Sequence, residues 1–272
     1  MGAVIQIAVA VFLASCVSLY AQSNVLRTST GVLERDTGGA CRMLPQSIWS
    51  NCVYGLASGT NYSTSVYYDI GPGRNNGTQE TANQRPTWVT NGYGAYSFDG
   101  SDDNIMLSNA CSFAGLSSGT VCCWYRHGAN PAANAALIYE ATSEAGYSRF
   151  AAFVLTDGST LAAYRDTNAG SPYTASGSSM SAGTWYHVGM TVNANTDAMY
   201  LYINGVAVGT NTTAKGAMTT NAPNGHCVGA LYSGVTHVYS VNGIIDEAYK
   251  FNRDLSASEM SNLYNATKRG HP

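Results

Sequence analysis

The sequence predicts an all-β fold: a two-sheet antiparallel β-sandwich with one short C-terminal helix and an N-terminal extension. About a dozen short segments alternate between apolar and polar residues, and clusters of Gly, Ser, Asn and Asp separate them. Only 11% of the 272 residues are charged, whereas 29 are Gly and 19 are Tyr, which is typical of a turn-dense β protein. The first complete helix signal begins at residue 256.

Composition also restricts the partners. The formal net charge is -3 and no Lys/Arg cluster is present, so we expect no binding to nucleic acid. Seven cysteines leave at least one unpaired, and both disulfides and buried thiols remain open interpretations. Cys122 and Cys123 are adjacent in an expected strand, so their side chains should point to opposite faces.

The N-terminal part divides into an apolar segment, residues 1–26, and a connector, residues 27–65, before a domain at 66–268. The apolar segment has no charged side chain, and three interpretations stay open. It is a secretory signal whose Leu13 to Cys16 resemble a lipobox with Cys16 lipidated, a membrane anchor, or a segment packed within an assembly. Membrane contact is expected only through this segment, if at all.

Turn residues and alternating runs predict the strands in order. Ala95 to Phe98 and Ile105 to Leu107 are expected to form a hairpin around Asp99 to Asp102. The next expected strands are Val121 to Tyr125, Ala136 to Tyr139, Phe150 to Leu155, Leu161 to Tyr164 and, with Tyr186, Val188, Met190 and Val192 on one face, Trp185 to Val192.

The strongest hairpin signal lies between residues 199 and 208. Leu201 and Ile203 alternate with tyrosines before the pair Asn204 and Gly205. A type I′ turn needs positive φ at both central positions, and Asn-Gly satisfies this requirement best. Cys227 to Leu231 adds a further strand.

The last stretch, residues 243–264, is expected to be a strand followed by a helix. Strict alternation would place Ile245, Glu247, Tyr249 and Phe251 on one face. Ser256 and Glu259 have the spacing of a capping box, and Leu255 and Met260 that of a hydrophobic staple. The helix should bury Met260, Leu263 and Tyr264.

Three of these motifs resemble a known family. GIIDEAYKFNRDLSASEMSNLY at 243–264 is similar to the closing motif of LamG-like, concanavalin A-like jelly rolls, although Lys250 stands where that family usually has an apolar residue. GAYSFDGSDDNIML at 94–107 and WYHVGMTV at 185–192 also resemble family motifs. The resemblance covers roughly residues 66–266 and implies a concanavalin A-like jelly roll.

The same resemblance raises the question of catalysis, because this fold also hosts glucanases. Retaining glycosidases need two carboxyl groups about 5–5.5 Å apart, and the family's Glu-x-Asp-x-x-Glu pattern does not occur in the sequence. Glu140 and Glu144 are four residues apart, and Asp246 and Glu247 should point to opposite faces. We therefore expect no enzymatic activity.

Calcium is the cofactor that the resemblance implies, with Asp246 of the last strand as a ligand. Asp99 is the second candidate ligand, and Asp69, Asp102 and Asp103 lie in loops that could join it, since Ca²⁺ prefers oxygen ligands. The alternative is that these aspartates cap their own turns. The five histidines, at 127, 187, 226, 237 and 271, are expected to be polar strand or loop residues.

Exposed aromatic side chains could stack on sugar rings. The candidates are Trp88, Tyr93, Tyr200, Tyr202, Tyr232 and Tyr239, and the sequence does not say which of them line a site.

The sequence thus predicts a non-catalytic, surface-displayed binding protein, such as a virion or phage appendage, that recognises a glycan or a neighbouring protein and belongs to a homo-oligomer or larger assembly. Its expected location is extracellular or on a virion. The alternatives are a purely structural assembly subunit, a secreted or lipid-anchored bacterial adhesin and, last, a glycoside hydrolase.

Overall fold

The computed structural model describes residues 25–28, 31–35, 41–56, 65–90, 94–141, 149–166, 171–218, 225–232, 237–268 and 271. Of residues 25–46, 232 and 237 it describes only the backbone. The predictions for residues 1–24, including lipidation of Cys16, lie outside these ranges. No helix within them is long and apolar enough to cross a membrane.

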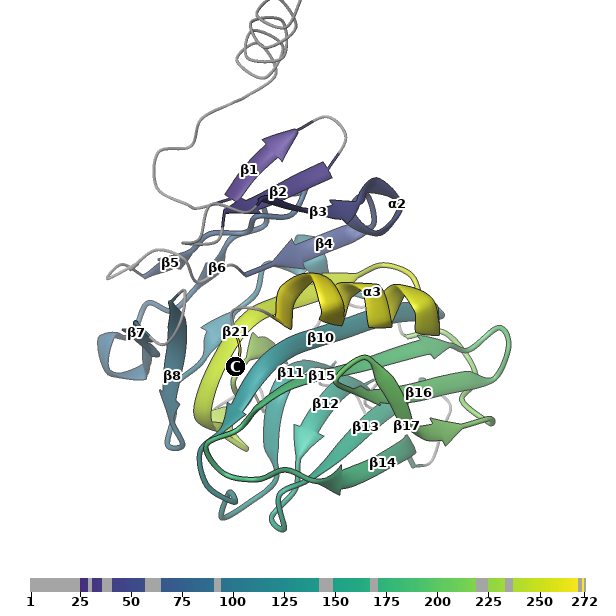
Figure 1. Cartoon of the computed structure of the whole chain (residues 1–272). Helices are drawn as coiled ribbons and strands as arrows, with labels where there is room; N and C mark the ends of the chain where they lie inside the picture. Colours follow the sequence, from purple (N-terminus) through teal and green to yellow (C-terminus); the bar gives the residue numbers. More distant parts are fainter. Residues whose placement is uncertain are drawn as a thin grey trace, which may run out of the picture.

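Two antiparallel sheets face each other and form the body of the protein (Figure 1). The first contains β17 (Val206–Asn211), β16 (Ala198–Ile203), β15 (Trp185–Asn193), β10 (Ser118–His127), β21 (Asn242–Phe251), β8 (Ala95–Asp99) and β7 (Thr87–Val89), with β4 (Cys52–Gly55) also paired to β21. The second contains β14 (Tyr173–Ser179), β13 (Ser159–Arg165), β12 (Arg149–Val154), β11 (Ala135–Ala141), β18 (Gly225–Val228), β9 (Ile105–Met106), β6 (Gly77–Thr78) and β5 (Val66–Tyr67). The predicted all-β sandwich is confirmed.

Alternation along the strands builds the core between the sheets. On β15, Val188, Met190 and Val192 are buried in this core, and Tyr186 packs against it, as the sequence predicts. Cys122 and Cys123 do point to opposite sides, because Cys123 belongs to this core and Cys122 to a separate cluster on the outer face. The five cysteines whose side chains are described, Cys52, Cys111, Cys122, Cys123 and Cys227, are all buried, and Cys111, Cys122 and Cys123 are free thiols.

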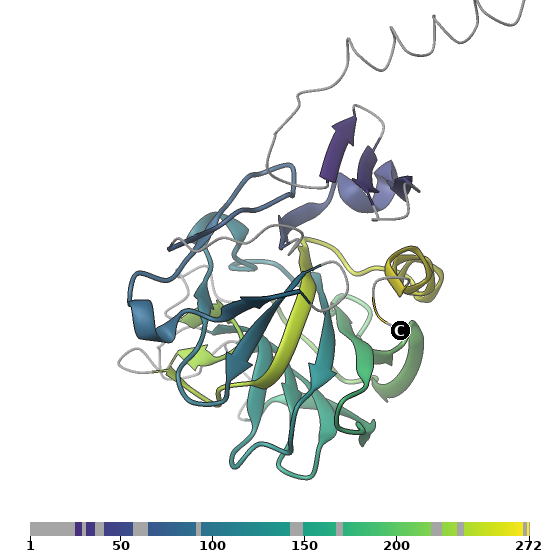
Figure 2. The same cartoon turned by 60° about the vertical axis from the view of Figure 1, so that its left-hand side comes forward.

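Helix α3 (Ala257–Thr267) covers the outer face of the first sheet: Figure 1 shows it lying over the strands, and Figure 2 shows it nearly end-on, outside the sandwich. Its N-terminus has the predicted capping box, with Ser256 Oγ accepting from Glu259 N and Glu259 bonding back to Ser256 N. Met260 and Leu263 are buried against Leu255 in the outer cluster. The hydrophobic stripe of the helix therefore holds it on the sheet.

The segment expected to be a connector, residues 27–65, contains strands and a helical turn. A small sheet of β1 (Val25–Thr28), β2 (Gly31–Arg35) and β3 (Cys41–Pro45) precedes the single turn α2 (Gln46–Trp49). Strand β4 then pairs with β21 inside the sandwich. The remaining short elements are β19 (Leu231–Tyr232), β20 (His237–Val238), η1 (Ala82–Gln84) and η2 (Asn109–Cys111).

Two predictions about strand geometry are wrong. Residues 95–107 form no hairpin, because β8 pairs with β21 and β7 while β9 pairs with β18 and β6 in the other sheet. In β21, Glu247 and Ala248 together lie opposite Cys123, and Glu247 has a φ of 47°. This bulge inverts the alternation, so that Ile245 faces the core whereas Tyr249 and Phe251 face the helix.

The turn between β16 and β17 has the predicted geometry. Asn204 and Gly205 have φ values of 52° and 76° and join β16 to β17, which confirms the predicted Asn-Gly hairpin.

Candidate functional site

A groove of about 390 Å³ opens on the outer face of the first sheet, where β15 and β16 meet the turn that precedes α3. Its lining combines hydroxyl, amide, carboxylate and phenol groups with small apolar side chains. The lining residues are Thr191, Asn193, Thr196, Ala198, Tyr200, Tyr202, Ala207, Asp254, Leu255, Ser256 and Ala257.

The strand register explains how the floor of the groove forms. Thr191 of β15 lies opposite Tyr200 of β16, and their neighbours Met190 and Leu201 point into the core. Because side chains alternate along a strand, Thr191 and Tyr200 face outward together. Tyr200 is 36% exposed and Tyr202 only 2%, and their ring centroids are 6.2 Å apart. Tyr200 thus presents its ring to solvent beside a ring that is fixed in place.

Polar groups surround these rings. Asn193 Nδ2 donates to Asp254 Oδ2 at 3.2 Å, which joins β15 to the turn after β21. Burial raises the pKa of Tyr202, and the hydrogen bond with Thr191 opposes that rise in pKa, so Tyr202 stays a neutral phenol. The half-buried Asp254 is the one charged side chain among the lining residues.

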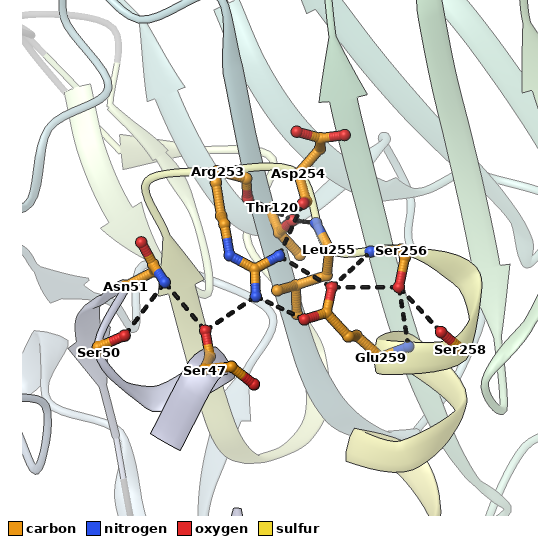
Figure 3. A network of polar contacts seen from close by, with 10 residues as sticks. All are labelled: Ser47, Ser50, Asn51, Thr120, Arg253, Asp254, Leu255, Ser256, Ser258 and Glu259. Carbon is orange, nitrogen blue, oxygen red and sulfur yellow. Dashed lines mark hydrogen bonds and ion pairs between the residues drawn. The ribbon is translucent and has the colours of Figure 1, made fainter. Parts of the chain in front are cut away.

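A network of hydrogen bonds holds the turn at the end of the groove (Figure 3). Thr120 Oγ1 donates to Arg253 O at 2.8 Å and accepts from Leu255 N at 2.9 Å. Arg253 binds both carboxylate oxygens of Glu259, at 2.6 and 2.9 Å, and also donates to the carbonyl of Ser47. These bonds fix the backbone around Asp254.

The same hydrogen bonds shift the pKa values of Glu259 and Arg253. Hydrogen bonds from Arg253, followed by those from Ser256, lower the pKa of Glu259 to about 2 although partial burial opposes them. The Glu259 carboxylate in turn raises the pKa of Arg253. An exposed phenol ring beside hydroxyl, amide and carboxylate groups can stack on an apolar ring face and bond the hydroxyls at its edge.

The structure brings together three of the five predicted calcium ligands and leaves Asp246 and Asp69 apart from them. Asp99, Asp102 and Asp103 form the single group of three or more potential metal ligands within the described ranges, with ligand atoms within 4.8 Å of one another. Asp99 Oδ1 accepts from Ser101 N at 2.8 Å, and Asp103 Oδ2 accepts from Asp99 N at 3.0 Å, as turn caps do. Burial raises the pKa of Asp103 to about 6, so this carboxylate is partly protonated near neutral pH.

Asp246 lies apart from this group and binds the C-terminal segment. Its Oδ2 is 3.1 Å from His271 Nε2, and the imidazole stacks on Trp124 with centroids 4.2 Å apart. Asp69 also caps backbone, because its Oδ1 accepts from Gly55 N and Gly71 N at 2.8 and 2.6 Å. Calcium at Asp246 or Asp99 stays a prediction.

A second group of polar side chains lies between the sheets, away from the groove. Lys250 Nζ is 2.6 Å from Glu140 Oε2 and also contacts His226 Nε2, and all three side chains are almost fully buried. Glu140 Oε1 accepts from Ser112 Oγ and Phe113 N at 2.6 and 2.7 Å. The basic residue that departs from the family motif is therefore the partner of a buried carboxylate.

The remaining histidines and aromatics occupy different places. His127 contacts Tyr125 and Asn130, whereas His187 packs on Trp124 beneath α3. Tyr239 is 42% exposed outside the groove and Trp88 packs against the core. The side chains of Tyr93, Tyr232 and His237 are not described.

Of the aromatic candidates, the structure brings Tyr200 and Tyr202 into the groove. The sequence reasoning missed Asp254, Asn193 and Thr191. Asn193 and Asp254 are 61 residues apart, and no local pattern links them. The closing motif does place Asp254 two residues before the helix cap Ser256, which is the one signal that could have indicated it.

Comparisons with known proteins agree with the sandwich fold. The sequence model of the concanavalin A-like lectin/glucanases superfamily matches residues 99–261, which is more than half of the chain. The chain belongs to this superfamily. The predicted resemblance is confirmed. No curated protein matches the chain in sequence.

Several solved structures share the fold at low sequence identity. The binding domain of Paraclostridial Mosquitocidal Protein 1 is 18% identical with a TM-score of 0.60, and the match covers 80% of this chain and 53% of that one. The Botulinum neurotoxin serotype D binding domain is 16% identical with a TM-score of 0.61, covering 83% and 55%. A Trypanosoma rangeli sialidase in complex with the inhibitor DANA is 14% identical with a TM-score of 0.59, covering 82% and 33%. The chain thus spans about half or less of these proteins.

Proposed function

We propose that this protein is a non-catalytic glycan-binding protein whose site is the groove between Tyr200 and Asp254. The observation that carries the proposal is the exposed Tyr200 ring in a polar groove of about 390 Å³, which also contains the buried Tyr202 and the Asn193–Asp254 hydrogen bond. A phenol ring offers an apolar face, and the groups around it match the hydroxyls of a sugar. Membership of a lectin/glucanase superfamily supports the same conclusion.

The non-catalytic part of the proposal rests on the residues that line the groove. Asp254 is the single carboxylate among them, whereas hydrolysis with retention uses two carboxyl groups about 5–5.5 Å apart. Glu140, a strand carboxylate weighed for catalysis, is buried and paired with Lys250.

Display on an extracellular or virion surface is a further part of the proposal, supported by the weakly charged, Gly- and Tyr-rich composition.

Glycan binding is tested by applying the full chain to an array of neutral and acidic glycans and by titrating the best ligand in a calorimeter. Tyr200→Ala should weaken binding about tenfold or more, which corresponds to ~1.4 kcal/mol. Tyr239→Ala is the matched control, since Tyr239 is 42% exposed and lies outside the groove. Absence of any ligand would contradict the proposed function, and equal losses in both variants would contradict the groove as its site.

We also propose that calcium binds near Asp99, in line with the prediction from the sequence. The carboxylates of Asp99, Asp102 and Asp103 offer the oxygen ligands that Ca²⁺ prefers. Calcium should raise the melting temperature of the wild type more than magnesium does, and Asp102→Asn should reduce that shift. An identical shift with both ions, or none, would contradict this site.

A further inference from the structure

Among its described lining residues, the groove carries negative charge without a compensating positive group. Its lining contains the carboxylate of Asp254 and no Lys, Arg or His. One oxygen of this carboxylate accepts from Asn193 Nδ2 at 3.2 Å. Figure 3 shows the carboxylate pointing away from the adjacent Arg253. Asp254 can therefore accept hydrogen bonds from a ligand while its charge stays in the groove.

The basic side chain next to Asp254 in the sequence is already engaged. Arg253 donates to both oxygens of Glu259, to the carbonyl of Ser47 and to the carbonyl of Asp254. Lys215 is 3.6 Å from Asp197, the neighbour in sequence of the lining residue Thr196, and pairs with it at the surface. Neither side chain offers a free cation to the groove.

The N-terminus of α3 lies at the edge of the groove, because Ser256 and Ala257 line it. Helix N-termini generally attract anions. In this protein Glu259 already supplies that anion, since its carboxylate accepts from Ser256 N at 2.9 Å and Ser256 Oγ accepts from Glu259 N. The chain's own carboxylates, Glu259 and the neighbouring Asp254, therefore occupy the place that an anionic ligand would take at this helix N-terminus.

We infer that the groove selects neutral glycans and excludes those with carboxylate or sulfate groups. The inference rests on the proposed function and specifies its ligand class. Sugar hydroxyls can donate to Asp254 or to Thr196 Oγ1 and accept from the second Nδ2–H of Asn193, whereas an anionic sugar would face Asp254 with no cation to pair with among the described lining residues. Like charges in a partly buried groove repel more strongly than in bulk water.

The test uses matched ligands that share one core, such as N-acetyllactosamine with and without a terminal sialic acid, and a neutral and an oxidised form of one β-glucan oligosaccharide. The wild-type full chain should bind the neutral member of the pair it recognises at least tenfold more tightly at low salt. Asp254→Asn keeps the size and the acceptor oxygen and removes the charge, so the preference should fall severalfold. Added salt should also reduce the preference in the wild type by screening.

Asp157→Asn is the control, because it removes one charge from an exposed turn outside the groove lining. It should leave the preference unchanged. If the wild type binds acidic glycans better and Tyr200→Ala abolishes that binding, the neutral selection is wrong while the proposed function stands. If Asp254→Asn leaves the preference unchanged, charge is not its cause and the inference fails. If no glycan binds at all, the proposed function fails first.

Discussion

Two acid–base pairs, whose basic members Lys250 and Arg253 are three residues apart in the sequence, show how the environment decides what such a pair does. Lys250 binds Glu140 between the sheets, where the two side chains are 1% and 2% exposed. Arg253 binds Glu259 at the edge of the groove, where the side chains are 28% and 24% exposed. The separation is 2.6 Å in both pairs. Pairs of equal separation do not contribute equally to the free energy of unfolding. Removal of one partner leaves an unpaired buried charge in the first pair but a hydrated charge in the second.

The largest expected effect comes from removing the buried cation. Lys250→Met leaves the Glu140 carboxylate with Ser112 and Phe113 as hydrogen-bond donors and without its counter-ion. We expect the free energy of unfolding to fall by about 3–5 kcal/mol. Urea denaturation at pH 7 measures the change.

A double variant sharpens this result. Glu140→Gln combined with Lys250→Met removes both charges and keeps an oxygen that accepts from Phe113 N. It should recover at least half of the stability that Lys250→Met loses, since a neutral buried amide costs less than an unpaired carboxylate. A double variant as unstable as the sum of its single variants would show that the two residues do not act as a pair.

The second effect is the response of the buried pair to acid. Burial, and then the charge of Lys250, lower the pKa of His226 to about 3 from an ordinary value of 6.5. Below pH 6.5 the unfolded chain therefore binds a proton at His226 that the folded chain does not, and stability falls as the pH drops toward 3. Burial raises the pKa of Glu140, but Lys250 and His226 lower it by more, so the pKa of Glu140 in the folded chain lies below its ordinary value. The stability that Glu140 contributes is therefore also lost as the pH falls.

His226→Gln isolates the histidine in this response. The difference in unfolding free energy between wild type and variant should change by about 1.4 kcal/mol per pH unit below the ordinary histidine pKa, with the wild type losing more. The high pKa of Asp103 acts in the opposite direction, but it is present in both proteins and cancels in the difference. Parallel pH curves for the two proteins would contradict the assignment of this proton to His226.

Local and distant interactions also separate what the sequence predicts from what it cannot. The capping box at Ser256 and the turn at Asn204 need contacts only a few residues apart, and both are confirmed. The bulge at Glu247 arises from pairing with β10, about 120 residues earlier in the chain, so simple alternation assigns the wrong face to Tyr249. Two tyrosines of the groove are visible as alternating strand residues, whereas Asp254 joins them only through the fold.

The third effect tests the cap that positions the edge of the groove. Ser256→Ala removes the hydroxyl that accepts from Glu259 N, and we expect a loss of about 1 kcal/mol in the free energy of unfolding. Ser258→Ala is the control, because among described contacts Ser258 Oγ bonds only to Ser256 Oγ and is exposed. Equal losses in both variants would place the effect in helix propensity or solvation instead of the cap.

The smallest effect is expected for the exposed member of the comparison. A double-mutant cycle with Arg253→Met and Glu259→Gln should give a coupling energy of about 0.2–1 kcal/mol, since water can solvate whichever charge remains. Although Arg253 holds the pKa of Glu259 at about 2, partial exposure reduces what this shift contributes to stability. The coupling should also decrease in 0.5 M salt, whereas the Glu140–Lys250 coupling should hardly change because ions do not reach the space between the sheets. Equal salt sensitivity of the two pairs would mean that burial is not what distinguishes them.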